Sequence, residues 1–355
     1  MREFEKNIRR VTPYTPGEQP QTADKIKLNT NENPYPPAPG VSRAMKEMKA
    51  DTLRLYPDPS AHVLVDALAD FYGVTREQIF VGVGSDDVLS MCFLTFFNSG
   101  KPILFPNITY SFYKVWAELY RISYETPLLG EDFRIRPEDY YRDNGGVIFP
   151  NPNAPTSRYE NLDSIRDILD HNRDVIVIVD EAYIDFAGPS ALPLLAEYDN
   201  LLVVQTFSKS RSMAGMRIGY CIGSPYLISC LNDTKYSFNS YTLNQPSLYY
   251  GVEAVKDRKY FYDTIAKIKA TRDRASEELH RLGFRFPEPS GNFFFASHPD
   301  HHGDELFRYL RDRNIYVRHW DAPELTEYLR ITVGTDEEMK ILFENIRAFL
   351  QPTAE

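Results

Sequence analysis

Residues 200–223 read NLLVVQTFSKSRSMAGMRIGYCIG. Both ends of this stretch are apolar, which is typical of buried strands. The middle contains Lys209 and Arg217, diluted by serine, alanine and glycine. Charged side chains are rarely buried without a partner, so the partners of Lys209 and Arg217 are central to what the protein does.

Short apolar runs of the same kind occur along the preceding part of the chain. They are IFVGVG (79–84), KPILFP (101–106), GGVIFP (145–150) and DVIVIVD (174–180). Stretches with helical periodicity lie between them, among them NLDSIRDILDHN (161–172). Apolar runs that do not alternate with polar residues indicate a sheet buried on both faces, which is usually parallel. The sequence therefore predicts an α/β fold in which helices flank a mostly parallel central sheet.

The character of the sequence differs at the two ends. Residues 1–40 are irregular and rich in proline, which argues against a regular helix or a central strand. After about residue 245, long helical patterns surround a few strands, which indicates a smaller α+β unit. We predict an N-terminal arm (1–40), a large domain (41–250) and a small C-terminal domain (251–355).

Composition and charge exclude several classes of protein. A net charge of −10 argues against extensive nucleic-acid binding. The N-terminus lacks the apolar core of a signal peptide, and no apolar run approaches a membrane span. Cys92, Cys221 and Cys230 lack a paired spacing, so we expect reduced thiols in a cytoplasmic protein.

Polar residues follow several of the predicted strands. Gly84, Ser85 and Asp86 come after the first strand and open a predicted helix, and Asp180 and Lys209 follow later strands. In parallel α/β sheets, ligands bind at the carboxyl ends of the strands, and the N–H groups at a helix start attract phosphate.

Each feature alone has an ordinary explanation: a tight turn, a helix cap or a solvated loop lysine. Together they fit pyridoxal 5'-phosphate, which needs a phosphate cup, a carboxylate for its ring nitrogen and a lysine for a Schiff base. Arg217 adds a cation for the phosphate.

The motifs extend this pattern to almost the whole chain. They are VTPYTPGEQP, LNTNENPYPP, LYPDPS, GVGSDD, NPNAPTS, VDEAYIDF, TFSKSRSMAGMRIGY and YLRITVG. With them the chain resembles the fold-type I pyridoxal-phosphate aminotransferases, and within these it is most similar to the histidinol-phosphate aminotransferase family. The resemblance implies exchange of an amino group between L-histidinol phosphate and 2-oxoglutarate, giving imidazole-acetol phosphate and L-glutamate, in histidine biosynthesis.

The resemblance also implies a role for individual residues. Lys209 would form the Schiff base and Asp180 would pair with the ring nitrogen, while Tyr183 and Asn153 would bind the ring oxygen. Tyr110 would stack on the ring. The residues expected around the cofactor phosphate are Gly84, Ser85, Asp86, Ser208 and Arg217.

Further implied contacts concern the partner and the substrate. Tyr56 would reach the phosphate of a neighbouring subunit, so the resemblance implies a homodimer with shared sites, to which the arm contributes. Tyr14 and Arg330 match substrate-binding positions, and Arg318 is a second candidate for the substrate phosphate.

The chain departs from the family at residues 152–157, where the usual PNNPTG is PNAPTS. Ala154 cannot contact the ring oxygen, so we expect Asn153 to do so. Ser157 replaces a common glycine. The histidine-rich stretch 298–305 reads as a polar loop before a helix rather than as a metal site.

Three other functions stay open at this stage. A threonine-phosphate decarboxylase or an aromatic amino-acid aminotransferase would use the same cofactor. A non-catalytic regulator that binds this cofactor would need a DNA-binding segment, and no basic helix-turn-helix stretch is present.

Overall fold

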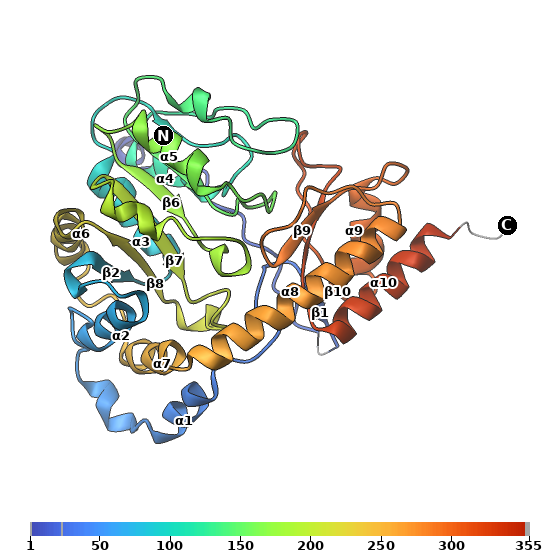
Figure 1. The fold of residues 1–355 in the computed structure, drawn as a ribbon, viewed down its shortest axis with the longest axis horizontal. Coiled ribbons are helices and arrows are strands. Elements are labelled where there is room, and N and C mark those ends of the chain that lie inside the picture. Colours follow the sequence, from blue (N-terminus) through green and yellow to red (C-terminus); the bar gives the residue numbers. More distant parts are fainter. Residues whose placement is uncertain (1, 23, 352–355) are drawn as a thin grey trace.

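The computed structural model describes residues 2–22 and 24–351. Residues 1, 23 and 352–355, which belong to the predicted arm and C-terminal domain, lie outside this description. Figure 1 shows a helix-covered sheet and a smaller part, with one long helix, α8, running between them. The helices are α1 (Pro39–Glu47), α2 (His62–Tyr72), α3 (Ser85–Phe96), α4 (Phe112–Tyr120), α5 (Leu162–Asp170), α6 (Pro225–Phe238), α7 (Gln245–Lys256), α8 (Arg258–Arg281), α9 (Gly303–Arg311) and α10 (Asp336–Leu350).

The main sheet has seven strands in the order β2–β8–β7–β6–β5–β3–β4. They are β2 (Ile79–Gly82), β3 (Ile103–Leu104), β4 (Tyr124–Glu125), β5 (Val147–Pro150), β6 (Val177–Asp180), β7 (Leu201–Thr206) and β8 (Gly219–Gly223). Within this sheet only β8 runs against the others. The predicted α/β fold with a mostly parallel sheet is confirmed.

Both faces of the sheet are buried, as the continuous apolar runs predicted. In β6, Ile178 packs into a cluster with residues of α3, α4 and α6, whereas Val177 and Val179 pack into a second cluster with residues of α5. Successive side chains of a strand point to opposite faces, so an apolar residue at every position serves two cores.

The antiparallel direction of β8 follows from the short connection that precedes it. Residues 207–218 contain one short 3-10 turn (Ala214–Met216) and no crossover helix. A parallel neighbour needs a long crossover, usually through a helix, whereas an antiparallel one does not. The loop with Lys209 and Arg217 therefore joins β7 to β8 at one edge of the sheet.

The smaller part contains two short sheets. β9 (Phe293–Ala296) pairs antiparallel with β11 (Leu329–Thr332), and β1 (Ile26–Lys27) pairs parallel with β10 (Ile315–Tyr316). The arm thus supplies a strand to the smaller part. The domain limits at residues 40 and 250 stay predictions; α7 spans the second and packs against α1 and α2.

The long helical pattern after residue 245 forms two helices, α7 and α8, which meet at Asp257. The Asp257 side chain accepts a hydrogen bond from the Tyr260 N–H at 3.0 Å and caps α8. The sequence patterns did not single out α4 and α6. No described helix has the length and apolarity needed to cross a bilayer.

Candidate active site

Four strand ends meet at one edge of the main sheet. Gly82 and Thr206, at the ends of β2 and β7, both pair with Gly219 at the start of β8. Asp180 ends β6 and pairs with Val204 of β7. The residues that the sequence placed after these strands are therefore brought together, as expected at the carboxyl ends of parallel strands.

Lys209 points across this edge toward the arm. Its Nζ donates a hydrogen bond to the Thr30 carbonyl oxygen at 2.9 Å and lies 5.5 Å from the centre of the Tyr183 ring. The lysine is thus held by a neutral acceptor rather than by a carboxylate. Its amine lies beside the ring that the sequence assigned to the same site.

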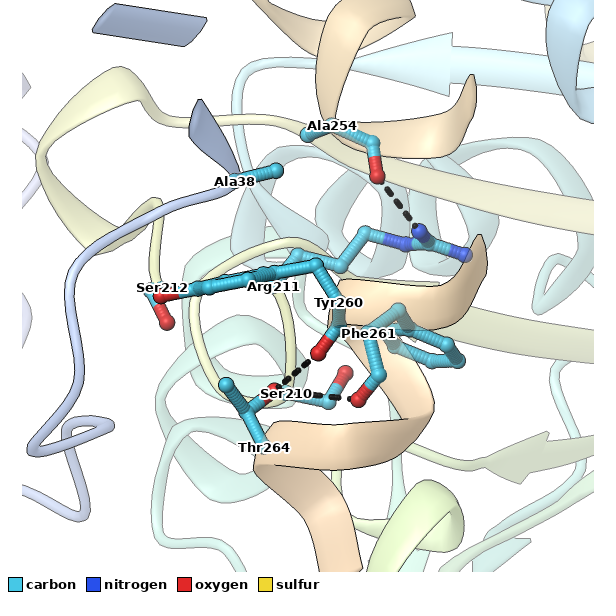
Figure 2. Close-up of a pocket in the computed structure, with 8 residues that line it drawn as sticks. All are labelled: Ala38, Ser210, Arg211, Ser212, Ala254, Tyr260, Phe261 and Thr264. Carbon is cyan, nitrogen blue, oxygen red and sulfur yellow. Dashed lines mark hydrogen bonds between the residues drawn. The ribbon is translucent and has the colours of Figure 1, made fainter. Parts of the chain in front are cut away.

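Arg211 anchors the Lys209 loop to the neighbouring helices. This buried arginine donates to the Ala254 carbonyl oxygen at 3.0 Å, and its guanidinium lies 4.1 Å from the centre of the Phe261 ring (Figure 2). It also lies 4.6 Å from the centre of the Phe71 ring. Cation–π contacts of this kind strengthen when water is excluded. The loop is therefore fixed to α2, α7 and α8.

Asp180 is a buried carboxylate, only 4% exposed. It accepts hydrogen bonds from the Tyr113 hydroxyl at 2.8 Å and from the Ala182 N–H at 3.2 Å. Burial raises the pKa of Asp180 to about 6, and nearby Asp86 adds to this rise, although the two hydrogen bonds oppose it. A cation placed beside Asp180 would restore the charged form.

The start of α3 forms a cradle with Arg217. Gly84 has a φ of 84°, and a Cβ there would lie 2.5 Å from Arg217 Nη2, so only glycine leaves the guanidinium in place. A Cβ on Gly219 would lie 2.2 Å from the backbone of Gly84 and Ser85. The first N–H groups of α3, from Ser85 onward, have no intrahelical acceptor and can bind an anion.

Arg217, Ser208, Asp86 and Tyr110 form a chain of contacts next to this cradle. Arg217 Nη1 donates to Ser208 Oγ at 3.3 Å and Nη2 to Asp86 Oδ2 at 3.2 Å. The Tyr110 hydroxyl donates to Asp86 Oδ1 at 2.7 Å. Asp86 thus fixes both Tyr110 and Arg217, a role that the sequence did not predict.

Asn153 is held by its own turn and by the loop that follows β3. Its Nδ2 donates to the Ile108 carbonyl oxygen and to Thr156 Oγ1, both at 2.9 Å, and its Oδ1 accepts from Thr109 Oγ1 at 3.1 Å. A contact from Asn153 to a cofactor ring oxygen stays a prediction, and it would require one of these bonds to be exchanged.

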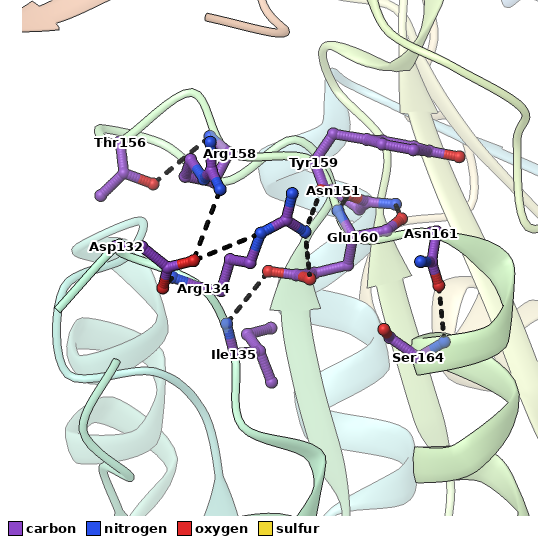
Figure 3. Close-up of polar contacts among 10 residues, drawn as sticks. All are labelled: Asp132, Arg134, Ile135, Asn151, Thr156, Arg158, Tyr159, Glu160, Asn161 and Ser164. Carbon is purple, nitrogen blue, oxygen red and sulfur yellow. Dashed lines mark hydrogen bonds and ion pairs between the residues drawn. The ribbon is translucent and has the colours of Figure 1, made fainter. Parts of the chain in front are cut away.

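The 151–160 turn that carries Asn153 is itself braced. Asn151 and Glu160 exchange two hydrogen bonds, and Glu160 Oε1 also accepts from the Ile135 N–H at 3.0 Å (Figure 3). Ser157 has a φ of 62°, and its hydroxyl accepts from the Gly291 N–H at 2.8 Å. The serine that replaces a common glycine therefore ties this turn to the smaller part.

Arg330 and Arg318 lie side by side on the smaller part, where their backbones pair. Arg330 Nη2 donates to the Asn29 carbonyl oxygen at 2.8 Å, and its Nε has no partner among the described residues. Arg318 donates to the carbonyl oxygens of Thr15 and Pro16, at 3.1 and 3.2 Å.

Burial lowers the pKa of Arg330, yet no carboxylate among residues 2–22 and 24–351 forms an ion pair with it. A partly buried cation held only by a carbonyl oxygen is suited to an anionic ligand. Lys209 and Arg330 are bound by the adjacent carbonyls of Thr30 and Asn29, so both cations converge on one short segment.

The two remaining predicted residues lie in different surroundings. The Tyr14 ring stacks on Phe112, with centres 4.3 Å apart, and lies 6.5 Å from the Tyr110 ring. Tyr56 is 79% exposed and stacks on Tyr241. Tyr14 therefore joins the site of its own chain, whereas Tyr56 faces outward.

Three contacts in the site are not predicted by the sequence patterns. Tyr113 binds Asp180, Asn31 Nδ2 donates to the Tyr183 hydroxyl at 3.1 Å, and the Thr30 carbonyl oxygen holds Lys209. The available signals were weak: Tyr113 comes three residues after Tyr110, and Asn31 lies within the motif LNTNENPYPP.

The residues at this edge fit the parts of pyridoxal 5'-phosphate. The glycine cradle at α3 suits a phosphate, the buried Asp180 carboxylate suits a ring cation, and Lys209 suits a carbonyl carbon. The fit rests on the combined chemistry of these groups at one edge of the sheet rather than on any single residue.

Because the pKa of Asp180 is raised, we expect the free energy of unfolding of the cofactor-free protein to depend on pH. Asp180 has a pKa of about 6 in the folded chain, against an ordinary value of 3.8, so the folded chain holds a proton that the unfolded chain has lost between these values. Its contribution to the free energy of unfolding therefore falls as pH rises through this window. Relative to Asp180→Asn, wild type should lose about 2–3 kcal/mol between pH 4 and 7.

Urea denaturation of both proteins across this pH range measures that difference. Titration of other groups is common to the two proteins and cancels. A difference in the free energy of unfolding that stays constant with pH would show that Asp180 titrates normally.

The architecture and its lysine-bearing edge define a fold-type I aminotransferase. A family model described as aminotransferase class I and II matches residues 23–346, and the chain belongs to this family. The chain is 46% identical over 348 residues to the histidinol-phosphate aminotransferase of Lactococcus lactis subsp. cremoris, covering 98% of both chains. It is 48% identical over 342 residues to that of Brachyspira hyodysenteriae, covering 96% of this chain and 97% of the relative.

Solved structures confirm the fold. The histidinol-phosphate aminotransferase of Clostridium acetobutylicum superposes with a TM-score of 0.84 at 22% identity, over 91% of this chain and 98% of that one. That of Sinorhizobium meliloti, in complex with pyridoxal-5'-phosphate, superposes with a TM-score of 0.81 at 23% identity, over 91% of both chains.

Proposed function

We propose that this chain is a pyridoxal-phosphate-dependent aminotransferase that interconverts L-histidinol phosphate and 2-oxoglutarate with imidazole-acetol phosphate and L-glutamate. The observation that carries the proposal is the convergence of Lys209 and Arg330 on adjacent carbonyls, next to the buried Asp180. The identity to curated histidinol-phosphate aminotransferases, 46–48% over nearly the whole chain, supports the substrate.

The bound cofactor supplies a carbonyl carbon and an electron-withdrawing ring. Lys209 would bind that carbon until the substrate amine takes its place, and its freed amine would then move a proton at the substrate carbon next to the nitrogen. Asp180 would keep the ring nitrogen protonated, since a buried carboxylate favours a cation beside it. The α3 start and Arg217 would hold the cofactor phosphate.

Histidinol phosphate has an amine and a phosphate but no carboxylate, so its recognition depends on cations for the phosphate. Arg330 and Arg318 would grip this group, since guanidinium donors match phosphate oxygens. Tyr14 would close the site from the arm. Arg318 already binds the carbonyls of Thr15 and Pro16, which keeps Tyr14 near the site.

We also propose a cytoplasmic homodimer in which Tyr56 reaches the partner's site. Several apolar side chains are exposed next in sequence to Tyr56, or at and near Tyr241 on which Tyr56 stacks, and this favours a subunit interface. They are Leu53, Leu55, Phe238 and Tyr241. The three cysteines are free in the structure, as suits a reducing compartment.

Arg330→Ala is expected to raise the KM for histidinol phosphate by about 10²-fold or more, because a charge-assisted contact to the phosphate is lost. Cofactor affinity should change by less than about threefold, since Arg330 lies on the smaller part. Steady-state kinetics and cofactor titration measure the two effects. An unchanged KM would remove Arg330 from the substrate site.

The function is tested by comparing donors. With 2-oxoglutarate as acceptor, kcat/KM for histidinol phosphate should exceed that for phenylalanine by at least about 10²-fold. Threonine phosphate should release no CO₂ above background. CO₂ release from threonine phosphate, or a preference for phenylalanine, would replace the proposed reaction by one of the two alternatives.

A further inference from the structure

Asn31 is a buried asparagine with a partner for every polar group. The residue is 0% exposed, and its φ of 55° lies in the left-handed region that asparagine tolerates. Its backbone N–H donates to Thr332 Oγ1 at 3.0 Å, and its carbonyl oxygen accepts from Asn292 Nδ2 at 3.2 Å. The residue is therefore fixed on its backbone before its side chain is considered.

The hydrogen bonds of Thr332 fix the direction of the Asn31 amide. Thr332 Oγ1 already accepts the Asn31 N–H, and its hydroxyl donates to Asn31 Oδ1 at 3.0 Å. If the amide were turned over, the buried Thr332 hydroxyl would lose its only acceptor among the described residues. Since leaving a buried donor without a partner costs about 1–3 kcal/mol, Nδ2 faces the other way.

Asn31 Nδ2 then donates to the Tyr183 hydroxyl oxygen at 3.1 Å. This is the only hydrogen bond of that hydroxyl within residues 2–22 and 24–351. A phenol carries a single hydrogen. Because its oxygen accepts from Asn31, the Tyr183 hydrogen points away from Asn31 and is available to another acceptor near Lys209, whose Nζ lies 5.5 Å from the Tyr183 ring centre.

We propose that Asn31 is a positioning residue that fixes the direction of the Tyr183 hydroxyl, so that Tyr183 donates its proton to the ring oxygen of the bound cofactor. This inference rests on the proposed function. In this chain of hydrogen bonds, the Thr332 hydroxyl donates to Asn31 and Asn31 donates to Tyr183. Tyr183 then donates to the ring oxygen.

A hydrogen bond donated to the ring oxygen has a measurable effect. It draws electron density from that oxygen and weakens the hold of the oxygen on the proton of the Lys209-linked nitrogen. The pH midpoint at which this nitrogen loses its proton is therefore lowered in wild type. Absorbance titration of the purified holoenzyme reports that midpoint without any turnover.

Asn31→Asp is the main test. Its carboxylate accepts the Tyr183 proton and reverses the chain of donors, so the midpoint should rise by about one pH unit. Asn31→Gly keeps the left-handed backbone, removes the amide and adds no charge. It should raise the midpoint by a smaller amount, and it serves where the aspartate variant does not fold.

The Tyr183→Phe background separates positioning from charge. If Asn31 acts through the Tyr183 hydroxyl, Asn31→Asp should lose most of its effect in that background, which is a coupling in a double-mutant cycle. An equal shift in both backgrounds would mean a direct charge effect and would overturn the inference. So would a wild-type midpoint in both Asn31 variants.

The failure of this inference is distinguishable from failure of the proposed function. Wild-type protein that forms no reducible link to pyridoxal 5'-phosphate would overturn the function and this inference with it. If wild type forms the link but the pH midpoint is unchanged in the Asn31 variants, this inference alone is overturned.

Discussion

Replacing Lys209 with alanine is expected to remove the borohydride-reducible link between the chain and its cofactor and to lower turnover by at least about 10⁴-fold. The expected loss is large because one amine both binds the carbonyl carbon and moves the substrate proton. Among the residues that the structure describes, only the Thr30 carbonyl holds this amine, so its removal takes no ion-pair partner from a carboxylate there. Mass spectrometry after reduction, together with steady-state turnover, measures both effects.

Lys101→Ala is the matched control for Lys209→Ala. Lys101 is an exposed lysine paired with Asp143 at the surface, so its removal should leave the link and turnover within about twofold of wild type. Circular dichroism should show the same fold for both variants. A reducible link that survives in Lys209→Ala would assign the covalent role to another lysine.

Asp180→Asn is expected to lower kcat by about 10³-fold while the protein stays folded. An ion pair at 4 Å with an effective dielectric constant of about 20 is worth about 4 kcal/mol, which corresponds to this factor. Asparagine keeps the size of the side chain and can still accept the Tyr113 proton, but it provides no charge for the ring nitrogen. Single-turnover kinetics with histidinol phosphate measures the loss.

Glu181→Gln is the control for the effect of charge. Glu181 is also buried, and burial raises its pKa to about 7, but its oxygens accept from Ser190, the Ala191 N–H and Gln205 instead of facing the sheet edge. Its kcat should fall by less than about tenfold. Equal losses in the two variants would show that Asp180 acts through stability rather than through a ring cation.

Much of this architecture follows from local sequence. Apolar residues at every position of VIVIV (175–179) and LLVV (201–204) require a sheet covered on both faces, and helices pack over these faces. Since the carboxyl ends of the strands share an edge, Asp180, Lys209 and Gly84 could be placed together from the order of strands alone. Arg217 joins them because β8 starts at this same edge.

Contacts between distant segments could not be predicted in the same way. Asn31 binds Tyr183 across 152 positions of sequence and Thr332 across 301, and no local pattern encodes such pairs. The direction of β8 depends on the lack of a crossover helix in residues 207–218, which apolar periodicity does not report. The Asn153 amide is bound in part by Ile108 and Thr109, which lie about 45 positions earlier and outside the motif that contains Asn153.

The most direct measurement of the central proposal is a single half-reaction. Holoenzyme is mixed with histidinol phosphate in the absence of 2-oxoglutarate, and the absorbance of the cofactor and the product are followed together. We expect complete conversion of the cofactor to its amine form, with one imidazole-acetol phosphate released per chain. An unchanged cofactor spectrum with histidinol phosphate, or conversion of the cofactor without release of the keto product, would contradict it.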